Sequence, residues 1–163
     1  MRRFLIMCSS ALVALSSFAT LTAAPASAAT TDPCKVLKTA EISKVFEGAQ
    51  VGKGDRGLKT AVNESCTFDV AAAGDRPAGT LTVNVMFKRG KAAYDGLKKE
   101  AGYVPTTGLA KSLYDEKTSA VLTLKGDVLL TMQGLFSGDE LPIVNHDVLA
   151  QLVAASKTGL KRV

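Results

Sequence analysis

The stretch CTFDVAAAGDRPAGTLTVNVMFK, residues 66–88, carries the clearest secondary-structure pattern in the chain. Its apolar side chains alternate with polar ones in two runs: Cys66, Phe68 and Val70, then Leu81, Val83, Val85 and Phe87. This period of two is typical of strands that bury one face. The segment AGDRPAG between the runs has the composition of a turn. The stretch therefore predicts an antiparallel hairpin with its apolar residues on one side.

Helical patterns flank this hairpin along the chain. Asp32 followed by Pro33 is a helix-start signal, because aspartate caps and proline has the φ angle of a first helical residue. A second start near Thr39 precedes apolar residues at helical spacing, namely Ile42, Val45 and Phe46. Further helices are predicted at residues 91–101 and 146–156, each followed by a glycine that can end it.

The remaining segments predict more strands. Residues 112–115, 119–124 and 128–135 have strand composition, and Gly126-Asp127 suits a two-residue turn between the last two. Residues 50–65 are rich in glycine and charge and predict a loop with at most a short strand. This order predicts an α+β fold: an antiparallel β-sheet of about five strands, packed with N-terminal and C-terminal helices.

The N-terminus has the features of an export signal. Arg2 and Arg3 precede an apolar run at residues 4–24, and Ala26-Ser27-Ala28 matches a cleavage site. We therefore expect a signal peptide at residues 1–28, a single domain at residues 29–163, and a secreted protein with no stable membrane insertion after cleavage. The alternative is an uncleaved anchor, because the run approaches the ~20 residues that span a bilayer.

Cleavage would leave two cysteines, Cys34 and Cys66. A lipid-attachment site needs a cysteine that follows the apolar run and has small residues immediately before it. Cys8 lies near the beginning of the run, and Cys34 is preceded by Thr31-Asp32-Pro33, so neither cysteine fits. An even pair in an exported chain predicts a disulfide. The alternatives are a metal site or a catalytic thiol, and both would depend on the chain's single histidine, His146.

The charge balance limits the kinds of partner. Without the signal peptide, 18 basic residues face 15 acidic ones, which gives a net charge of +3. So small an excess does not predict binding to nucleic acid. It is compatible with a mild preference for anionic wall polymers or lipid head groups.

Several short motifs resemble functional sites without their usual context. GKGDRG, residues 52–57, matches the nucleotide pattern G-x-G-x-x-G, but no apolar strand precedes it and no helix pattern follows it. SGDE, residues 137–140, has too few oxygen ligands in sequence for a calcium loop. The sequon Asn63-Glu64-Ser65 is interpreted as loop composition, and Tyr94, Tyr103 and Tyr114 are interpreted as packing residues.

No set of residues predicts catalysis. His146 lacks a serine elbow or a second histidine and is interpreted as a residue of the turn that starts the last helix. We therefore predict no catalytic residues, no metal site and no cofactor. A less favoured hypothesis, after a binding module and an inhibitor, is an enzyme that uses His146 with a carboxylate.

Three short motifs carry a resemblance to known proteins: Asp32-Pro33-Cys34, Cys66-Thr67-Phe68, and Gly108-Leu109-Ala110 before Leu113-Tyr114. They resemble small actinobacterial secreted proteins and lipoproteins of unknown function that share an Asp-Pro-Cys plus Cys-x-aromatic pattern. The resemblance implies a sensor-like domain with the fold of Mog1 and the photosystem protein PsbP, an antiparallel sheet between helices. It implies no catalytic residues.

These observations predict a secreted, non-enzymatic, envelope-associated binding or sensor-like module. Its unknown envelope or extracellular partner is expected to contact the second face of the hairpin. That surface comprises Thr82, Asn84 and Met86, with a basic edge of Lys88, Arg89 and Lys91. The alternative is an extracellular inhibitor of a protease or other hydrolase, with residues 60–65 as its inhibitory loop.

Overall fold

The computed structural model describes residues 31–74, 76–136 and 146–163, the side chains of residues 146 and 147 excepted. The predicted signal peptide at residues 1–28 and the SGDE segment at residues 137–140 lie outside the described residues. The described part contains four helices: α1 (Pro33–Val36), α2 (Thr39–Val45), α3 (Gly90–Leu97) and α4 (His146–Gly159). It contains seven strands: β1 (Asp55–Lys59), β2 (Asn63–Val70), β3 (Gly79–Met86), β4 (Tyr103–Pro105), β5 (Ser112–Asp115), β6 (Ala120–Lys125) and β7 (Val128–Phe136).

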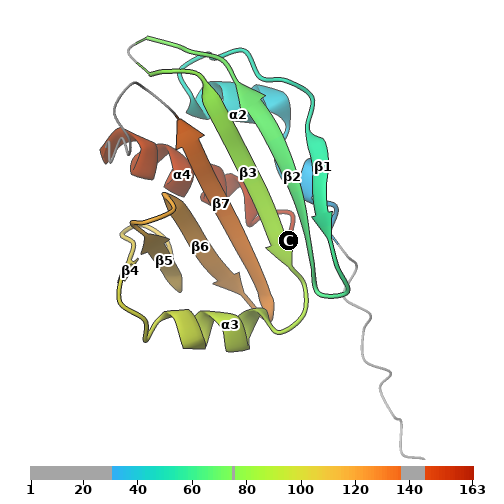
Figure 1. The fold of residues 1–163 in the computed structure, drawn as a ribbon, viewed down its shortest axis with the longest axis vertical. Helices are drawn as coiled ribbons and strands as arrows, with labels where there is room; N and C mark the ends of the chain where they lie inside the picture. Colours follow the sequence, from blue (N-terminus) through green and yellow to red (C-terminus); the bar gives the residue numbers. More distant parts are fainter. Residues whose placement is uncertain (1–30, 75, 137–145) are drawn as a thin grey trace, which may run out of the picture.

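The strands form one antiparallel sheet in the order β1-β2-β3-β7-β6-β5-β4 (Figure 1). The predicted hairpin of β2 and β3 is confirmed, with Cys66 opposite Val83 and Phe68 opposite Leu81. In Figure 1, α2 and α4 lie behind β3 and β7, while α3 lies along the lower end of the sheet. The α+β class with helices packed on an antiparallel sheet is therefore confirmed.

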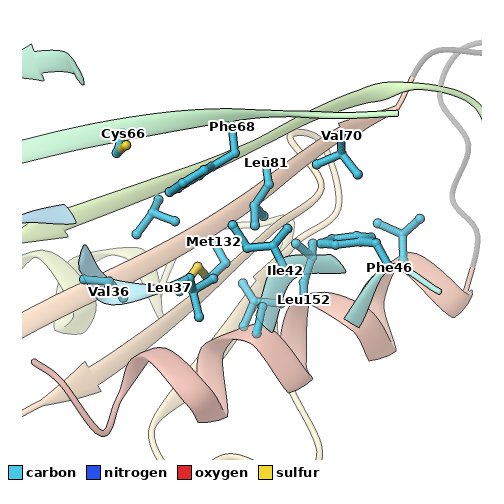
Figure 2. Close-up of a cluster of buried hydrophobic side chains, with 14 of the residues drawn as sticks. Val36, Leu37, Ile42, Phe46, Cys66, Phe68, Val70, Leu81, Met132 and Leu152 are labelled. Carbon is cyan, nitrogen blue, oxygen red and sulfur yellow. The ribbon is translucent and has the colours of Figure 1, made fainter. Parts of the chain in front are cut away.

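The larger core lies between the sheet and the helices α1, α2 and α4. Figure 2 shows Phe68, Leu81 and Met132 of the sheet pointing toward Ile42 of α2 and Leu152 of α4. All five side chains are buried. Alternation along β2 and β3 puts every second residue into this core, as the sequence pattern predicts. Burial of these apolar side chains stabilises the packing of the helices on the sheet.

A smaller core lies on the second face of the sheet, under α3. Tyr94 of α3 is buried there with apolar residues of β5, β6 and β7, namely Leu113, Ala120, Leu122, Leu124 and Leu129.

 Leu129 is the second residue of β7 and a buried member of this cluster. The predicted helix at residues 91–101 is shorter than expected, because after Leu97 the backbone bonds change to the tighter i→i+3 type, with Glu100 N donating to the Leu97 carbonyl at 2.9 Å. α3 thus covers part of the second face, where it packs on β6 and β7.

The expectation of about five strands is wrong, because the sheet has seven. The two unexpected strands are its edges. All five residues of β1 are exposed, so β1 shows no apolar alternation, and its register shifts between Arg56 and Lys59. β4 has three residues and ends in Pro105, which cannot donate a backbone hydrogen bond. Neither strand carries the hydrophobic pattern by which a strand is recognised in sequence.

The local signals at the N-terminal helices are confirmed in most respects. The Asp32 side chain caps α1 by accepting a hydrogen bond from the Cys34 backbone N–H at 3.1 Å. For α2 the cap residue is Lys38 and not Thr39, and the Lys38 N–H donates to the Glu41 carboxylate at 2.8 Å. The chain then leaves α2 through Gly48, whose φ of +81° favours glycine.

The Cys34–Cys66 disulfide is confirmed, with 5.1 Å between the two Cα atoms. It joins the start of α1 to the central part of β2. Of the helices in the described part, none is long and apolar enough to cross a membrane.

The C-terminus is attached to the N-terminal helices by an ion pair. Arg162 donates two hydrogen bonds to the Glu41 carboxylate, at 2.8 and 2.7 Å, and a third to the Val36 carbonyl at 2.7 Å. The hydrogen bonds from Arg162 lower the pKa of Glu41 from its ordinary value of 4.5 to about 2, against the opposing effect of desolvation.

This pKa shift predicts a pH-dependent contribution to stability. Because the pKa of Glu41 is lower in the folded state, its contribution is complete above pH 4.5 and is lost as the pH falls toward about 2. We expect Glu41→Gln to lower the melting temperature by a few degrees at pH 7, and the difference from wild type to vanish near pH 2. Thermal denaturation between pH 2 and 7 measures this. Glu116→Gln, at an exposed position, is the control; an equal loss there contradicts the assignment.

Candidate functional site

The second face of the sheet is open where α3 does not cover it. On this face the register of β2, β3 and β7 aligns polar side chains in rows across the strands. The first two rows are Ser65, Asn84 and Thr131, then Thr67, Thr82 and Gln133. The third is Asp69, Thr80 and the exposed Leu135. We call these nine residues the open face.

Hydrogen bonds hold part of the open face in place. The hydroxyl groups of Thr67 and Thr82 lie 3.1 Å apart, and the Gln133 amide donates to the Thr118 carbonyl at 3.0 Å. Most of the nine side chains are half-buried, because neighbours on a sheet cover one another. The open face therefore presents mainly hydroxyl and amide groups at fixed spacing, with the Asp69 carboxylate and the Leu135 side chain exposed in its third row, and is suited to contacts with a polar partner.

The structure divides the predicted binding residues into two groups. Thr82 and Asn84 belong to the open face, as the strand alternation predicts. Lys88 and Arg89 lie beyond the end of β3 and are exposed. Met86 lies between the two groups and packs against the core under α3. The polar residues and the basic edge are therefore neighbours along β3 and do not form one continuous patch.

The basic edge has a fixed backbone. The Asp127 carboxylate, from the turn between β6 and β7, accepts hydrogen bonds from the N–H groups of Arg89 at 3.2 Å and Lys91 at 3.0 Å. Gly90 packs against the same turn, where an added Cβ would lie 2.4 Å from the Asp127 carbonyl oxygen. Asp127 thus caps α3 from another part of the chain. The sequence assigned Gly126-Asp127 to a turn, which is confirmed, but gave no signal for this cap.

Lys91 also lines a cleft between α3 and the segment that joins β4 to β5. The cleft has a volume of about 460 Å³. Lys98 and Lys111 line it as well, together with buried apolar residues. Lys91 forms an ion pair with Asp95, one turn along α3. The hydrogen bond with Asp95 raises the pKa of Lys91, and the same bond lowers the pKa of Asp95.

Most of the other candidate residues lie apart from the open face. Of the predicted inhibitory loop, residues 60–65, only residues 60–62 form the turn between β1 and β2. Asn63, Glu64 and Ser65 belong to β2 and pair with β3, so the interpretation of this sequon as loop composition is wrong, and Ser65 is part of the open face. The Thr60 hydroxyl donates to the Asn63 side-chain oxygen at 2.6 Å and accepts from the Asn63 N–H at 3.0 Å. The predicted inhibitory loop is therefore a short closed turn with little free backbone. His146 begins α4, and its side chain lies outside the described part.

The remaining motifs belong to strands or to the packed core within the described residues. In GKGDRG, strand β1 begins at Asp55, so no helix follows the glycines and the arrangement of a nucleotide site is absent from this described segment. Tyr94 and Tyr114 are buried, which confirms their interpretation as packing residues, and Tyr103 is half-buried in β4. Within the described residues, no group of three or more His, Cys, Asp or Glu side chains is placed to hold a metal ion.

Comparisons of the chain with protein-family models, curated proteins and solved structures find no match.

Proposed function

We propose that this protein is a secreted, non-enzymatic binding module of the bacterial envelope, which contacts its partner through the open face. The observation that carries the proposal is the half-covered sheet. α3 packs on β6 and β7, while the polar rows of β2, β3 and β7 have no helix over them in the described part. Many sheet faces are polar only because they contact water. On this face the pairing of β2, β3 and β7 aligns the polar side chains in rows across the strands.

The basic edge supports a partner with negative charge near this face. Lys88 and Arg89 are exposed, and the hydrogen bonds that Asp127 accepts from the N–H groups of Arg89 and Lys91 fix the backbone at Arg89. Charges at the rim of an interface act mainly on the association rate and on its salt dependence. An anionic protein or polymer of the envelope has the chemistry that this edge would attract.

A crosslinking experiment tests the use of the open face. A photo-crosslinking amino acid at Thr82, in the centre of the open face, is expected to capture a discrete partner from the envelope fraction of the native culture. The same amino acid at Ala154, an exposed position on α4, is the matched control. Mass spectrometry identifies the product. Crosslinks that are the same from both positions, or that arise only from Ala154, contradict the proposal.

Charge reversal tests the basic edge separately. Lys88→Glu with Arg89→Glu is expected to weaken partner capture and to reduce its sensitivity to salt, because rim charges steer association. The fold should be retained, since both side chains are exposed. Lys44→Glu with Lys161→Glu changes the net charge equally on the helical side and is the control. Unaltered capture by the folded Lys88 and Arg89 variant removes the basic edge from the interface.

A further inference from the structure

The cleft beside α3 has the size and lining of a ligand site. Its volume of about 460 Å³ lies within the range of roughly 300 to 1,000 Å³ that is usual for small-molecule pockets. Tyr94, Leu113 and Leu124 give it a buried apolar floor. Lys91, Tyr94 and Lys98 recur at helical spacing, which places them on one side of α3. Lys111 faces them from the segment before β5.

Positive charge exceeds negative charge in this cleft. Lys91 is paired with Asp95, but in the part of the chain that is described neither Lys98 nor Lys111 has a carboxylate within 4.0 Å. Ammonium groups without a paired carboxylate attract a bound anion. The charge distribution therefore favours a ligand with a negatively charged group.

Tyr94 adds a hydroxyl group to the lining of the cleft. Its side chain is 7% exposed and lines the cleft. Burial raises the pKa of Tyr94, so the hydroxyl keeps its proton at neutral pH. A protonated phenol hydroxyl can donate a hydrogen bond to an oxygen atom of an anion. A ligand oxygen in the cleft would accept this hydrogen bond.

The opposite wall is held in a defined conformation before any ligand binds. The Ser112 hydroxyl donates to the Leu109 carbonyl at 3.0 Å and also contacts the Thr106 hydroxyl. The Leu124 N–H donates to the Lys111 carbonyl at 2.9 Å. Lys111 itself has a φ of +50°, a left-handed conformation that is unfavourable for lysine. A wall fixed in this way lowers the entropy lost on binding.

We propose that this cleft binds a small amphipathic anion, with a carboxylate or phosphate group at Lys98, Lys111 and the Tyr94 hydroxyl. The apolar body of the ligand packs on Leu113 and Leu124. The site is separate from the open face, so its occupation does not depend on the partner proposed above.

Four probes separate the two halves of the proposed ligand. Octanoate and octyl phosphate have both a charged group and an apolar body, octanol has only the body, and inorganic phosphate has only the charge. We expect the two amphipathic anions to bind at least about tenfold more tightly than octanol or inorganic phosphate, a difference of about 1.4 kcal/mol or more. Isothermal titration measures the affinities. Equal binding of octanol, or no binding of either amphipathic anion, overturns the proposal.

Two variants locate the binding. Lys98→Ala with Lys111→Ala is expected to weaken octanoate binding about tenfold or more, and Tyr94→Phe is expected to weaken it several-fold while keeping the buried ring. The control is Lys35→Ala with Lys38→Ala, which removes the same charge from another groove beside the disulfide. An equal loss of binding in the control, or no loss in the Lys98 and Lys111 variant, contradicts the assignment.

Whether the anion is a membrane lipid or a free molecule is tested by comparing vesicles with a monomeric ligand. Phosphatidylglycerol vesicles that bind wild type and not the Lys98 and Lys111 variant identify a membrane lipid. Binding of monomeric octanoate without vesicle binding identifies a free amphiphile. Partner capture from Thr82 in the Lys98 and Lys111 variant reports on the open face alone, so failure of the cleft proposal is distinguishable from failure of the proposed function.

Discussion

Replacing both Cys34 and Cys66 by alanine is expected to lower the free energy of unfolding by about 3 to 4 kcal/mol. The disulfide joins residues that are 32 positions apart, so it removes many conformations from the unfolded chain. It also has a packing role. The backbone of Gly54 lies against the disulfide, where an added Cβ would be 2.6 Å from the Cys66 sulfur. Loss of the disulfide therefore also loosens the start of β1.

Urea denaturation, followed by circular dichroism, measures this change. Alanine is preferred to serine because Cys66 is fully buried and a serine hydroxyl there would need a hydrogen-bond partner. A reducing agent should destabilise the wild type by a similar amount and leave the double variant unchanged. An unfolding midpoint that is the same for wild type and variant without reductant contradicts this prediction.

The central part of the fold was predictable because its residues carry periodic patterns. Cys66, Phe68 and Val70 alternate in β2, and every second residue of β3 is apolar, so the hairpin and its buried face follow from the sequence alone. The cap at Asp32 is also local, because its side chain bonds the N–H two residues later. Patterns of this kind depend on neighbours in sequence and need no knowledge of the tertiary structure.

The edges of the sheet and the cap of α3 were not predictable for the opposite reason. β1 is a strand because its backbone pairs with β2. All its side chains are exposed, so its sequence has no alternation of apolar and polar residues. Asp127 caps α3 from a turn that lies 36 residues after Lys91 in the chain. Such interactions are set by tertiary packing, which leaves little trace in local composition.

The candidate sites also divide into residues that a local pattern predicts and residues that only the tertiary structure brings together. Alternation in β3 was enough to place Thr82 and Asn84 on the second face. The cleft needs α3 and the segment before β5 to face each other, with Lys111 in a left-handed conformation that its residue type does not indicate. The sequence therefore indicated Lys91 as a basic surface residue, and gave no reason to group it with Lys98 and Lys111.

Phe46→Ala is expected to lower the free energy of unfolding by about 3 to 5 kcal/mol, because it leaves a cavity the size of an aromatic ring in the larger core. Phe46 is fully buried at the end of α2, and its ring centroid lies 5.2 Å from that of Phe136 in β7. The Arg76 guanidinium lies over both rings, 5.3 Å from the Phe46 centroid and 4.8 Å from the Phe136 centroid. Removal of the Phe46 ring therefore removes two contacts between separate elements, one with Phe136 and one with Arg76.

Arg76 makes this site unusually sensitive to the substitution. It donates to the Ala71 carbonyl at 3.0 Å and to the Pro77 carbonyl at 3.1 Å, which closes the connection between β2 and β3. With the Phe46 ring gone, the guanidinium faces a cavity and the loop that it holds is less constrained. Leu135→Ala is the matched control, because Leu135 precedes Phe136 in β7 but is 54% exposed on the other face, and should change stability by less than about 0.5 kcal/mol. Denaturant unfolding measures both variants, and equal effects at the two positions would show that the aromatic cluster is not the centre of this core.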